Sequence, residues 1–251
     1  MKSRITALIA GLALGSSLLF ASAGIATAAS PFAGLSGTGV CAAEFAALKT
    51  PSIAALRAFG DCEINRRFAT LSDLSARIAA SKVMTGSHAA ALQAGITSTR
   101  SGLTDLKSTI DAETSIPALQ LDIANIAANY RVYLLVVPQA NLINAADGVL
   151  SAQTRFATVN ANLAARIAAA RADGKDTTAA QADLDAMNAS VAAAVGLADP
   201  LAAQLLPLTP AQYDAGSGRP ILTAARTALG HARDDLRSAI ASARACRDAL
   251  E

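Results

Sequence analysis

Cysteine is the residue type with the most reactive chemistry in this chain, and it occurs at Cys41, Cys62 and Cys246. The stretch from Cys41 to Cys62 has the pattern of a short helix, a turn around residues 49–51 and a second helix. In such a hairpin the residue numbers of facing partners add up to about 101, which is close to the sum for Cys41 and Cys62. We therefore expect these two residues to form a disulfide, which would stabilise the fold by ~3 kcal/mol.

Two other arrangements of the cysteines are consistent with the sequence. A Cys62–Cys246 disulfide would require the last helix to end beside the start of the first long helix. Alternatively, all three cysteines are buried thiols. If Cys246 is the residue left over, it is a packed thiol near the chain end or the partner of an intermolecular bond.

A cluster of two tyrosines and an arginine is the best candidate for a contact patch. Tyr130, Arg131 and Tyr133 lie in the stretch ANYRVYLLVVPQANLI, residues 128–143, in a chain that is otherwise poor in aromatic residues. In one interpretation this patch holds a ligand or a partner. In the other, both tyrosines continue a helical stripe of apolar residues and belong to the core, while Arg131 pairs with a nearby acid. The spacing favours the core interpretation, and the apolar run 132–137 is too short to span a membrane.

Catalytic and metal-binding patterns are missing from the sequence. His88 and His231 each lack the glutamate three residues earlier that di-iron and di-manganese sites in helical bundles use. No C-x-x-C, H-E-x-x-H, EF-hand, G-x-S-x-G or P-loop pattern occurs. We therefore expect a protein that is not an enzyme, with no cofactor and no metal site.

The first 28 residues have the layout of a secretory signal peptide. The basic start MKSR precedes a short apolar stretch, and an A-x-A cleavage signal ends at Ala28. We predict cleavage just before Ala29 or Ser30 and a flexible lead-in over residues 29–40; an uncleaved anchor helix is the alternative. No later segment is expected to span a membrane, so we expect a secreted, extracytoplasmic protein at the cell surface or in the periplasm.

The charge balance argues against nucleic acid as a partner. The whole chain has 21 Lys and Arg residues against 19 Asp and Glu, and the predicted leader contains two of the basic residues and no acidic one. The exported chain would therefore have 19 of each. Nucleic-acid-binding proteins usually have a basic surplus or a basic stripe, so the expected partner is an unidentified protein or a component of the cell envelope.

Helical periodicity dominates the rest of the chain, in which alanine, the best helix former, supplies about a quarter of all residues. We predict five long helices, over residues 51–84, 88–112, 115–172, 178–206 and 220–249, in one all-helical unit of residues 41–251. Thr50 is the expected N-cap of the first helix, and Glu63 and Arg67 are expected to form an ion pair on its solvated side. The third helix contains Pro138, for which we predict a kink rather than a break.

These elements predict an all-α fold. We expect an elongated antiparallel bundle of about five long helices, in which a long kinked central helix carries a helical hairpin on each half. The alternative is a compact bundle that folds back at Pro138.

Three stretches resemble, in order and spacing, a loose group of uncharacterised exported alanine-rich helical proteins of Gram-positive and related bacteria. They are EINRRFATLSDLSARIAAS (63–81), YRVYLLVVPQANLINAADGVL (130–150) and LLPLTPAQY (205–213). The resemblance covers most of the mature chain and implies an exported helical protein. The group has no assigned function, so the resemblance transfers no functional residue.

These observations lead us to expect an exported non-catalytic helical protein that acts as a structural spacer or a protein-interaction module at the cell surface. One alternative is a helical protein that binds a small ligand in a pocket near Tyr130 and Tyr133. Another is a helical protein that unfurls on membranes.

Overall fold

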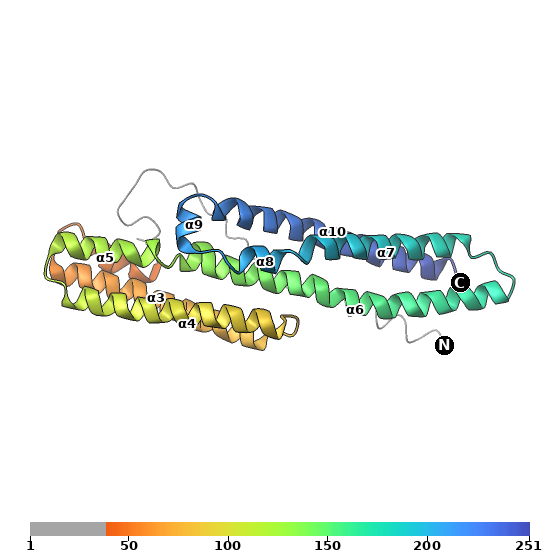
Figure 1. Cartoon of the computed structure of the whole chain (residues 1–251), viewed down its shortest axis with the longest axis horizontal. Coiled ribbons are helices and arrows are strands. Elements are labelled where there is room, and N and C mark those ends of the chain that lie inside the picture. Colours follow the sequence, from red (N-terminus) through yellow and green to blue (C-terminus); the bar gives the residue numbers. More distant parts are fainter. Residues whose placement is uncertain (1–38) are drawn as a thin grey trace.

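The structure is a computed structural model that describes residues 39–251, and within this range the chain is all-α without strands (Figure 1). The predicted signal peptide and residues 29–38 of the predicted lead-in lie outside the described residues. The last two lead-in residues belong to a 3-10 turn, η1 (Gly39–Cys41). The helices that follow form an elongated molecule of two lobes along one long central helix (Figure 1). The predicted elongated bundle, with a helical hairpin on each half of this central helix, is confirmed.

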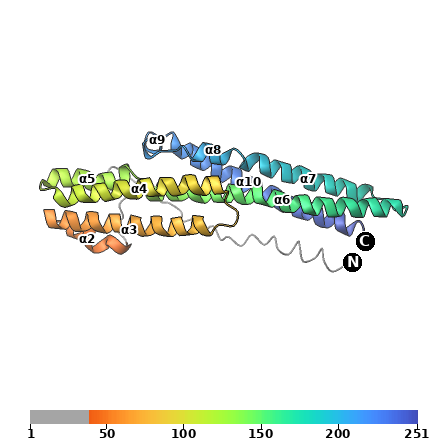
Figure 2. The same cartoon turned by 60° about the horizontal axis from the view of Figure 1, so that its bottom comes forward.

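The first lobe consists of α2 (Ala42–Ala47), α3 (Ile53–Ala80), α4 (Gly86–Ala112) and α5 (Ile116–Ala128). The three longer helices pack pairwise, and α2 lies against α3 (Figure 2). Helix α3 begins two residues later than predicted, because the side chain of Ser52, and not that of Thr50, accepts the hydrogen bond from the N–H of Ala55. The buried apolar stripe of α3 consists of Leu56, Phe59, Ile64, Leu71, Leu74 and Ile78.

A disulfide between Cys41 and Cys62 ties the start of α2 to α3, with 5.8 Å between the two Cα atoms. The pairing predicted from the helical hairpin is therefore confirmed. Cys246 is a buried free thiol on α10 (Gly218–Asp248), so the alternative Cys62–Cys246 disulfide and the alternative of three thiols are both wrong.

The central helix consists of α5, a five-residue π-helix η2 (Val132–Val136) and α6 (Val137–Ala172). Its irregular section precedes Pro138. Arg131 has a left-handed backbone, with φ 42° and ψ 39°. The N–H of Val136 donates to the carbonyl of Arg131, and the N–H of Val137 donates to the carbonyl of Val132; each acceptor lies five residues before its donor. Proline has no N–H and crowds the carbonyl four residues before it, so a widened π-turn is a suitable way to continue a helix into Pro138.

The second lobe consists of α6, α7 (Thr178–Ala198) and α10, which also pack pairwise (Figure 2). Two short helices, α8 (Leu201–Leu205) and α9 (Pro210–Asp214), connect α7 to α10. Alanine has a small side chain, so the α7–α10 pair is built largely from small buried residues. These are Ala180, Ala194 and Ala198 of α7 and Ala225, Ala232, Ala239 and Ala243 of α10.

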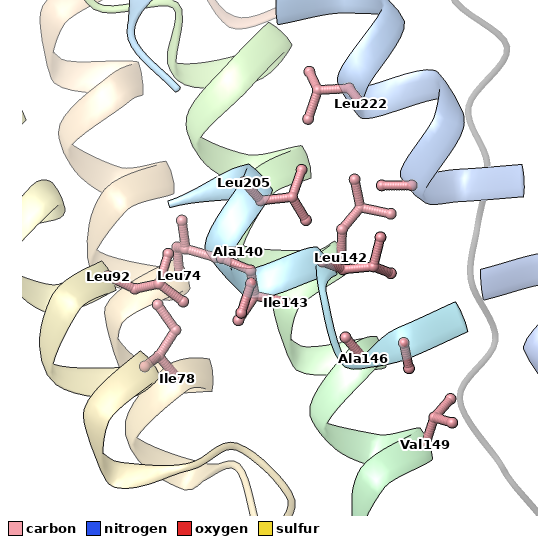
Figure 3. Close-up of a cluster of buried hydrophobic side chains, with 14 of the residues drawn as sticks. Leu74, Ile78, Leu92, Ala140, Leu142, Ile143, Ala146, Val149, Leu205 and Leu222 are labelled. Atoms are coloured by element: carbon pink, nitrogen blue, oxygen red, sulfur yellow. The ribbon is translucent and has the colours of Figure 1, made fainter. Parts of the chain in front are cut away.

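The apolar core continues from one lobe into the other. The end of the α3–α4 hairpin meets the first half of α6, and α8 and α10 cover the other side of that part of α6 (Figure 3). The residues that Figure 3 shows here include Leu74, Ile78, Leu92, Ile143, Ala146, Leu205 and Leu222, and all of them are buried.

One helical stretch in the described part of the chain, Thr178–Leu205, is long and apolar enough by length and composition to cross a membrane, with a mean hydropathy of 1.2. This finding differs from our expectation that no segment after the predicted leader is long enough to span a membrane. Leu184, Met187 and Val191 of this stretch are buried in the second lobe, and a core helix of a globular protein meets the same criterion. The absence of a membrane span after the leader therefore stays a prediction.

Candidate functional site

The three residues of the predicted contact patch point to three different elements. The ring of Tyr130 lies against Gly102 of α4. Arg131 forms an ion pair with Asp214 of α9, with 2.7 Å between Nη2 and Oδ1. The ring of Tyr133 faces α3. The structure therefore does not gather the three side chains on one face; each of them ties the irregular section of the central helix to a different neighbour.

The left-handed backbone at Arg131 explains this divergence. In a regular helix each residue turns by about 100°, so residues 130 and 133 would project on nearly the same side. The left-handed residue between them breaks that period. As the core interpretation predicts, both tyrosines are half-buried and pack against the core, and Arg131 is paired with an acid. Burial, with a smaller effect from Asp105, raises the pKa of the Tyr130 hydroxyl.

Tyr133 belongs to a partly buried polar cluster, which we call the Glu63 cluster: Glu63, Arg66, Arg67, Thr70 and Tyr133. The guanidinium carbons of Arg66 and Arg67 lie 4.7 and 5.2 Å from the centre of the Tyr133 ring, within the range of a cation–π interaction. Thr70 donates a hydrogen bond of 3.3 Å to the Tyr133 hydroxyl.

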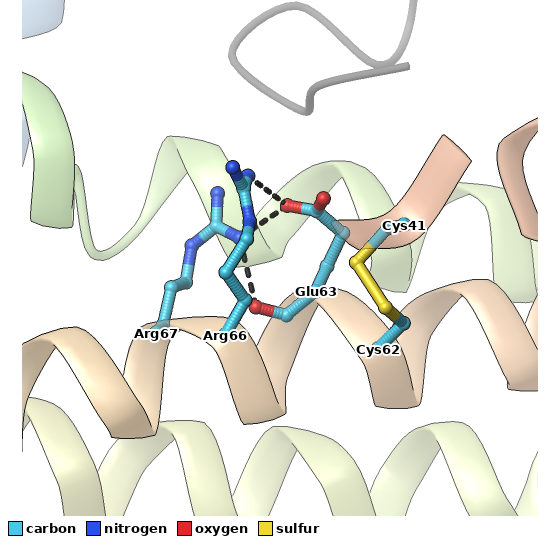
Figure 4. Close-up of a disulfide and its surroundings, with 5 residues drawn as sticks. All are labelled: Cys41, Cys62, Glu63, Arg66 and Arg67. Carbon is cyan, nitrogen blue, oxygen red and sulfur yellow. Dashed lines mark hydrogen bonds and ion pairs between the residues drawn. A yellow bond between two sulfur atoms is a disulfide. The ribbon is translucent and has the colours of Figure 1, made fainter. Parts of the chain in front are cut away.

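Glu63 holds both arginines of the cluster through one carboxylate oxygen (Figure 4). Arg66 Nη2 lies 2.7 Å from Glu63 Oε2, and Arg67 Nη1 donates to the same oxygen and to the Glu63 backbone carbonyl. Burial lowers the pKa of Arg67, and the hydrogen bond and charge of Glu63 oppose this effect. The second carboxylate oxygen, Oε1, and the Nε of Arg66 are buried and have no hydrogen-bond partner among the described residues.

The prediction that Glu63 and Arg67 lie on the solvated side of the first helix is wrong. Glu63 is 0% exposed and Arg67 is 1% exposed. The four-residue spacing indicated the pair correctly, but it carries no information about what covers the pair. Because the pair is buried, it matters more for the stability of the fold: removing one partner would leave an uncompensated charge in the interior.

A second buried carboxylate, Asp147 of α6, holds the turn between α3 and α4. Its Oδ2 accepts a hydrogen bond of 2.9 Å from the N–H of Thr85, and its Oδ1 lies 2.9 Å from Nδ1 of His88. In the same turn, the hydroxyl of Ser81 lies 2.6 Å from Oδ1 of Asn144, also on α6. Sequence reasoning missed this group because its members are about sixty residues apart in the chain. The available signal was Asp147 itself, an aspartate in the otherwise apolar stripe of INAADGVL.

An open hollow of about 510 Å³ lies at the turn between α6 and α7. Arg171 and Asp176 are among the residues that line it. Both are engaged locally, since Arg171 donates to the hydroxyl of Thr177 and Asp176 accepts from the N–H of Thr178. The hydrogen bonds from Thr178 lower the pKa of Asp176. These contacts lie within the turn that leads into α7.

At each of the sites described above, the polar side chains bind other parts of the same chain. Within residues 39–251 no group of three or more His, Cys, Asp or Glu side chains is arranged to hold a metal ion. No protein-family model, no curated protein and no solved structure matches the chain.

Proposed function

We propose that this protein is an exported, non-catalytic helical spacer or protein-interaction module at the cell surface. The observation that carries the proposal is the elongated architecture. The central helix runs from Ile116 to Ala172 with one irregular section, which corresponds to about 85 Å at ~1.5 Å per residue. One lobe contains the first part of this helix, α5, and the other lobe contains α6, so the described residues form a rod with two different ends.

Two further observations support this proposal. The Cys41–Cys62 disulfide suits an oxidising compartment outside the cytoplasm. In addition, Tyr130, Arg131 and Tyr133 contact α4, α9 and α3 of their own chain. This arrangement favours a rigid scaffold over a ligand pocket beside the tyrosines.

Small-angle scattering on the exported protein, combined with gel filtration, tests the shape. A rod of this length should have a radius of gyration of about 25 Å, against about 17 Å for a compact globule of this chain length. A radius of gyration near that of the compact globule would refute the spacer function.

Cross-linking on intact cells, followed by affinity capture and mass spectrometry, tests whether the protein lies at the cell surface. Recovery of the protein only from the cytoplasmic fraction, with residues 1–28 still attached, would refute a role at the cell surface.

A further inference from the structure

We propose that a row of exposed arginines on α10 binds a linear polyanion, a polymer chain that carries phosphate groups along its length. We call these residues the arginine row: Arg219, Arg226, Arg233, Arg237 and Arg244. The inference names a class of partner for the proposed interaction module, and it rests on the proposed function only for the place where the two meet.

The spacing of the five arginines places them on one side of α10. They follow one another at intervals of seven, seven, four and seven residues, and all five are exposed. Because each residue of a helix turns by about 100°, a step of seven residues makes nearly two full turns, and the five side chains start within about 40° of one another. From Arg219 to Arg244 the row is about 38 Å long at ~1.5 Å per residue. The arginine row is therefore narrow and nearly straight.

Several arginines of the row have no acidic partner. Arg226 and Arg244 form no ion pair in the described part of the chain, where the ion pairs of α10 involve other arginines. Arg219 lies over the ring of Tyr213, 4.8 Å from the ring centre. Stacking of this kind uses the face of the guanidinium group, so its edge can still donate hydrogen bonds. These three side chains are available to an anion.

Two acidic residues of α10 lie near the row. Asp234 is 3.8 Å from Arg233 and 2.8 Å from Arg237, and all three side chains are more than half exposed. Exposed ion pairs of this kind are weak, so a polyanion can compete with Asp234 for both arginines. Asp248 pairs with Arg247 in the last turn of the helix. The arginine row therefore ends before that turn.

The shape and composition of the row indicate which kind of anion it fits. A guanidinium group binds phosphate oxygens through two parallel hydrogen bonds, and a single file of such groups matches a chain of phosphates. Helices that bind a bilayer surface insert large apolar side chains beside their basic residues. The exposed large apolar residues in the described part of the chain, Val40, Leu121 and Leu134, all lie outside α10.

A nucleic acid is also a linear polyanion, but the row lacks what a single strand needs. Single-stranded nucleic acids stack their bases on aromatic side chains, and α10 contains no aromatic residue. The whole chain is also nearly balanced, with 21 basic and 19 acidic residues, so the positive charge of the row is a local feature. These observations favour a phosphate polymer without bases.

Fluorescence anisotropy with labelled long-chain inorganic polyphosphate and the full exported chain tests the proposal. We expect saturable binding at pH 7 that weakens at least tenfold between about 50 and 150 mM salt, because each phosphate contact releases counterions. Triphosphate at the same phosphate concentration should not displace the polymer, since it is too short to engage several arginines at once.

Substitutions place the binding on the arginine row. Arg226→Gln combined with Arg244→Gln should weaken the binding of polyphosphate about tenfold or more. The matched control is Lys49→Gln combined with Lys82→Gln, which removes the same charge from two exposed positions of the first lobe; it should change the affinity less than about twofold. Circular dichroism checks that both double variants remain folded.

Asp234→Asn should strengthen the binding of polyphosphate. The substitution removes the carboxylate that competes for Arg233 and Arg237, so we expect the affinity to rise about twofold or more. A gain of affinity of this kind cannot result from misfolding, and an unchanged or lower affinity would count against the arginine row.

Four outcomes would overturn the proposal. These are no binding of polyphosphate at low salt, an equal loss of affinity in the two double variants, tighter binding to anionic phospholipid vesicles or to single- or double-stranded DNA than to polyphosphate, and self-association of the protein through the row in gel filtration at low salt. Each of them leaves the shape and the cellular location untouched. Conversely, recovery of the protein only from the cytoplasm would refute the proposed function without changing the binding measured in solution.

Discussion

Single buried residues account for much of the specificity of this fold, and Glu63 and Asp147 illustrate two ways in which they act. Glu63 binds arginines of its own helix, so its ion pairs lie within one element. Asp147 binds the backbone of Thr85 and the ring of His88 on a different element. Neither carboxylate gains from burial alone, because removing a charge from water is unfavourable. Each is tolerated because charged or N–H donors surround it, and each selects one arrangement of its neighbours.

Cys246 is expected to be unreactive in the folded protein. The residue is 0% exposed, and burial, with a smaller effect from Asp183, raises the pKa of its thiol, so less of the reactive thiolate is present at pH 8. Alkylation with iodoacetamide at pH 8 should be at least about a hundredfold slower in the native than in the denatured protein. Mass spectrometry should count one modified cysteine after denaturation alone and three after denaturation with reduction. Rapid labelling of the native protein would contradict this expectation.

Gly102 and Gly95 of α4 should respond to alanine in opposite ways. A Cβ at Gly102 would lie 2.7 Å from both Cε1 and Oη of Tyr130, whereas a Cβ at Gly95 has nothing within 4 Å. Gly95→Ala should raise the free energy of unfolding by about 1 kcal/mol through helix propensity. In Gly102→Ala, displacement of the stiff Tyr130 ring should outweigh that gain and lower the stability by about 1 kcal/mol. Urea denaturation monitored by circular dichroism measures both, and equal stabilisation of the two variants would show that Tyr130 does not pack against α4.

At the scale of elements, the central helix is the part of the fold with the most unusual geometry. A left-handed residue and a π-helix precede Pro138, and the section they form is tied to α3, α4 and α9 by its side chains. Because a non-glycine residue in the left-handed region costs roughly 1–2 kcal/mol, this conformation persists only where the surrounding contacts select it. The ion pair between Arg131 and Asp214 is one of those contacts.

Two substitutions of Arg131 separate the backbone strain from the ion pair. Arg131→Ala and Arg131→Gly both remove the contact with Asp214, but only glycine adopts φ 42° without steric strain. Arg131→Gly should therefore be more stable than Arg131→Ala by about 1 kcal/mol. Chemical denaturation of the two variants measures the difference. If alanine were as stable as glycine at this position, the left-handed backbone at residue 131 would be ruled out.

At the scale of the whole molecule, the end of the α3–α4 hairpin connects the first lobe to the second. Apolar residues of both lobes form one continuous core there (Figure 3), and Asn144 and Asp147 of α6 bind the turn that follows α3. This second connection, in addition to the chain itself, should keep the two lobes from bending independently about the irregular section of the central helix.

Asp147→Asn should weaken this connection. The substitution keeps the shape of the side chain but replaces a charged acceptor of hydrogen bonds by a neutral amide, so we expect the free energy of unfolding to fall by about 1–3 kcal/mol. The amide of Thr85 should also exchange faster with solvent. Asp234→Asn on α10 is a suitable control, because the Asp234 side chain is 61% exposed and exposed ion pairs contribute little. An Asp147→Asn protein as stable as the control would mean that the core alone holds the hairpin on α6.

Sequence patterns were sufficient for those features that depend on residues close together in the chain. The spacing of apolar residues located the long helices, because helix hydrogen bonds join residues four apart and one face must be buried. The same local geometry predicted the Cys41–Cys62 disulfide across a helical hairpin. It also identified Glu63 and Arg67 as an ion pair. The N-cap of α3 was misplaced by two residues, because Thr50 and Ser52 are both good caps and the choice between them depends on the turn before the helix.

The remaining features depend on contacts between distant parts of the chain, and the tertiary structure alone decided them. Whether Glu63 and Arg67 face solvent depends on which elements pack over α3, and this is not encoded in their spacing. Pro138 is compatible with a kink, a break or a π-turn, and the choice depends on contacts that Tyr130, Arg131 and Tyr133 make with three other helices. The partners of Asp147 lie about sixty residues earlier in the chain. A local pattern determines which backbone hydrogen bonds form, whereas burial and long-range pairing depend on the free energy of the whole packed assembly.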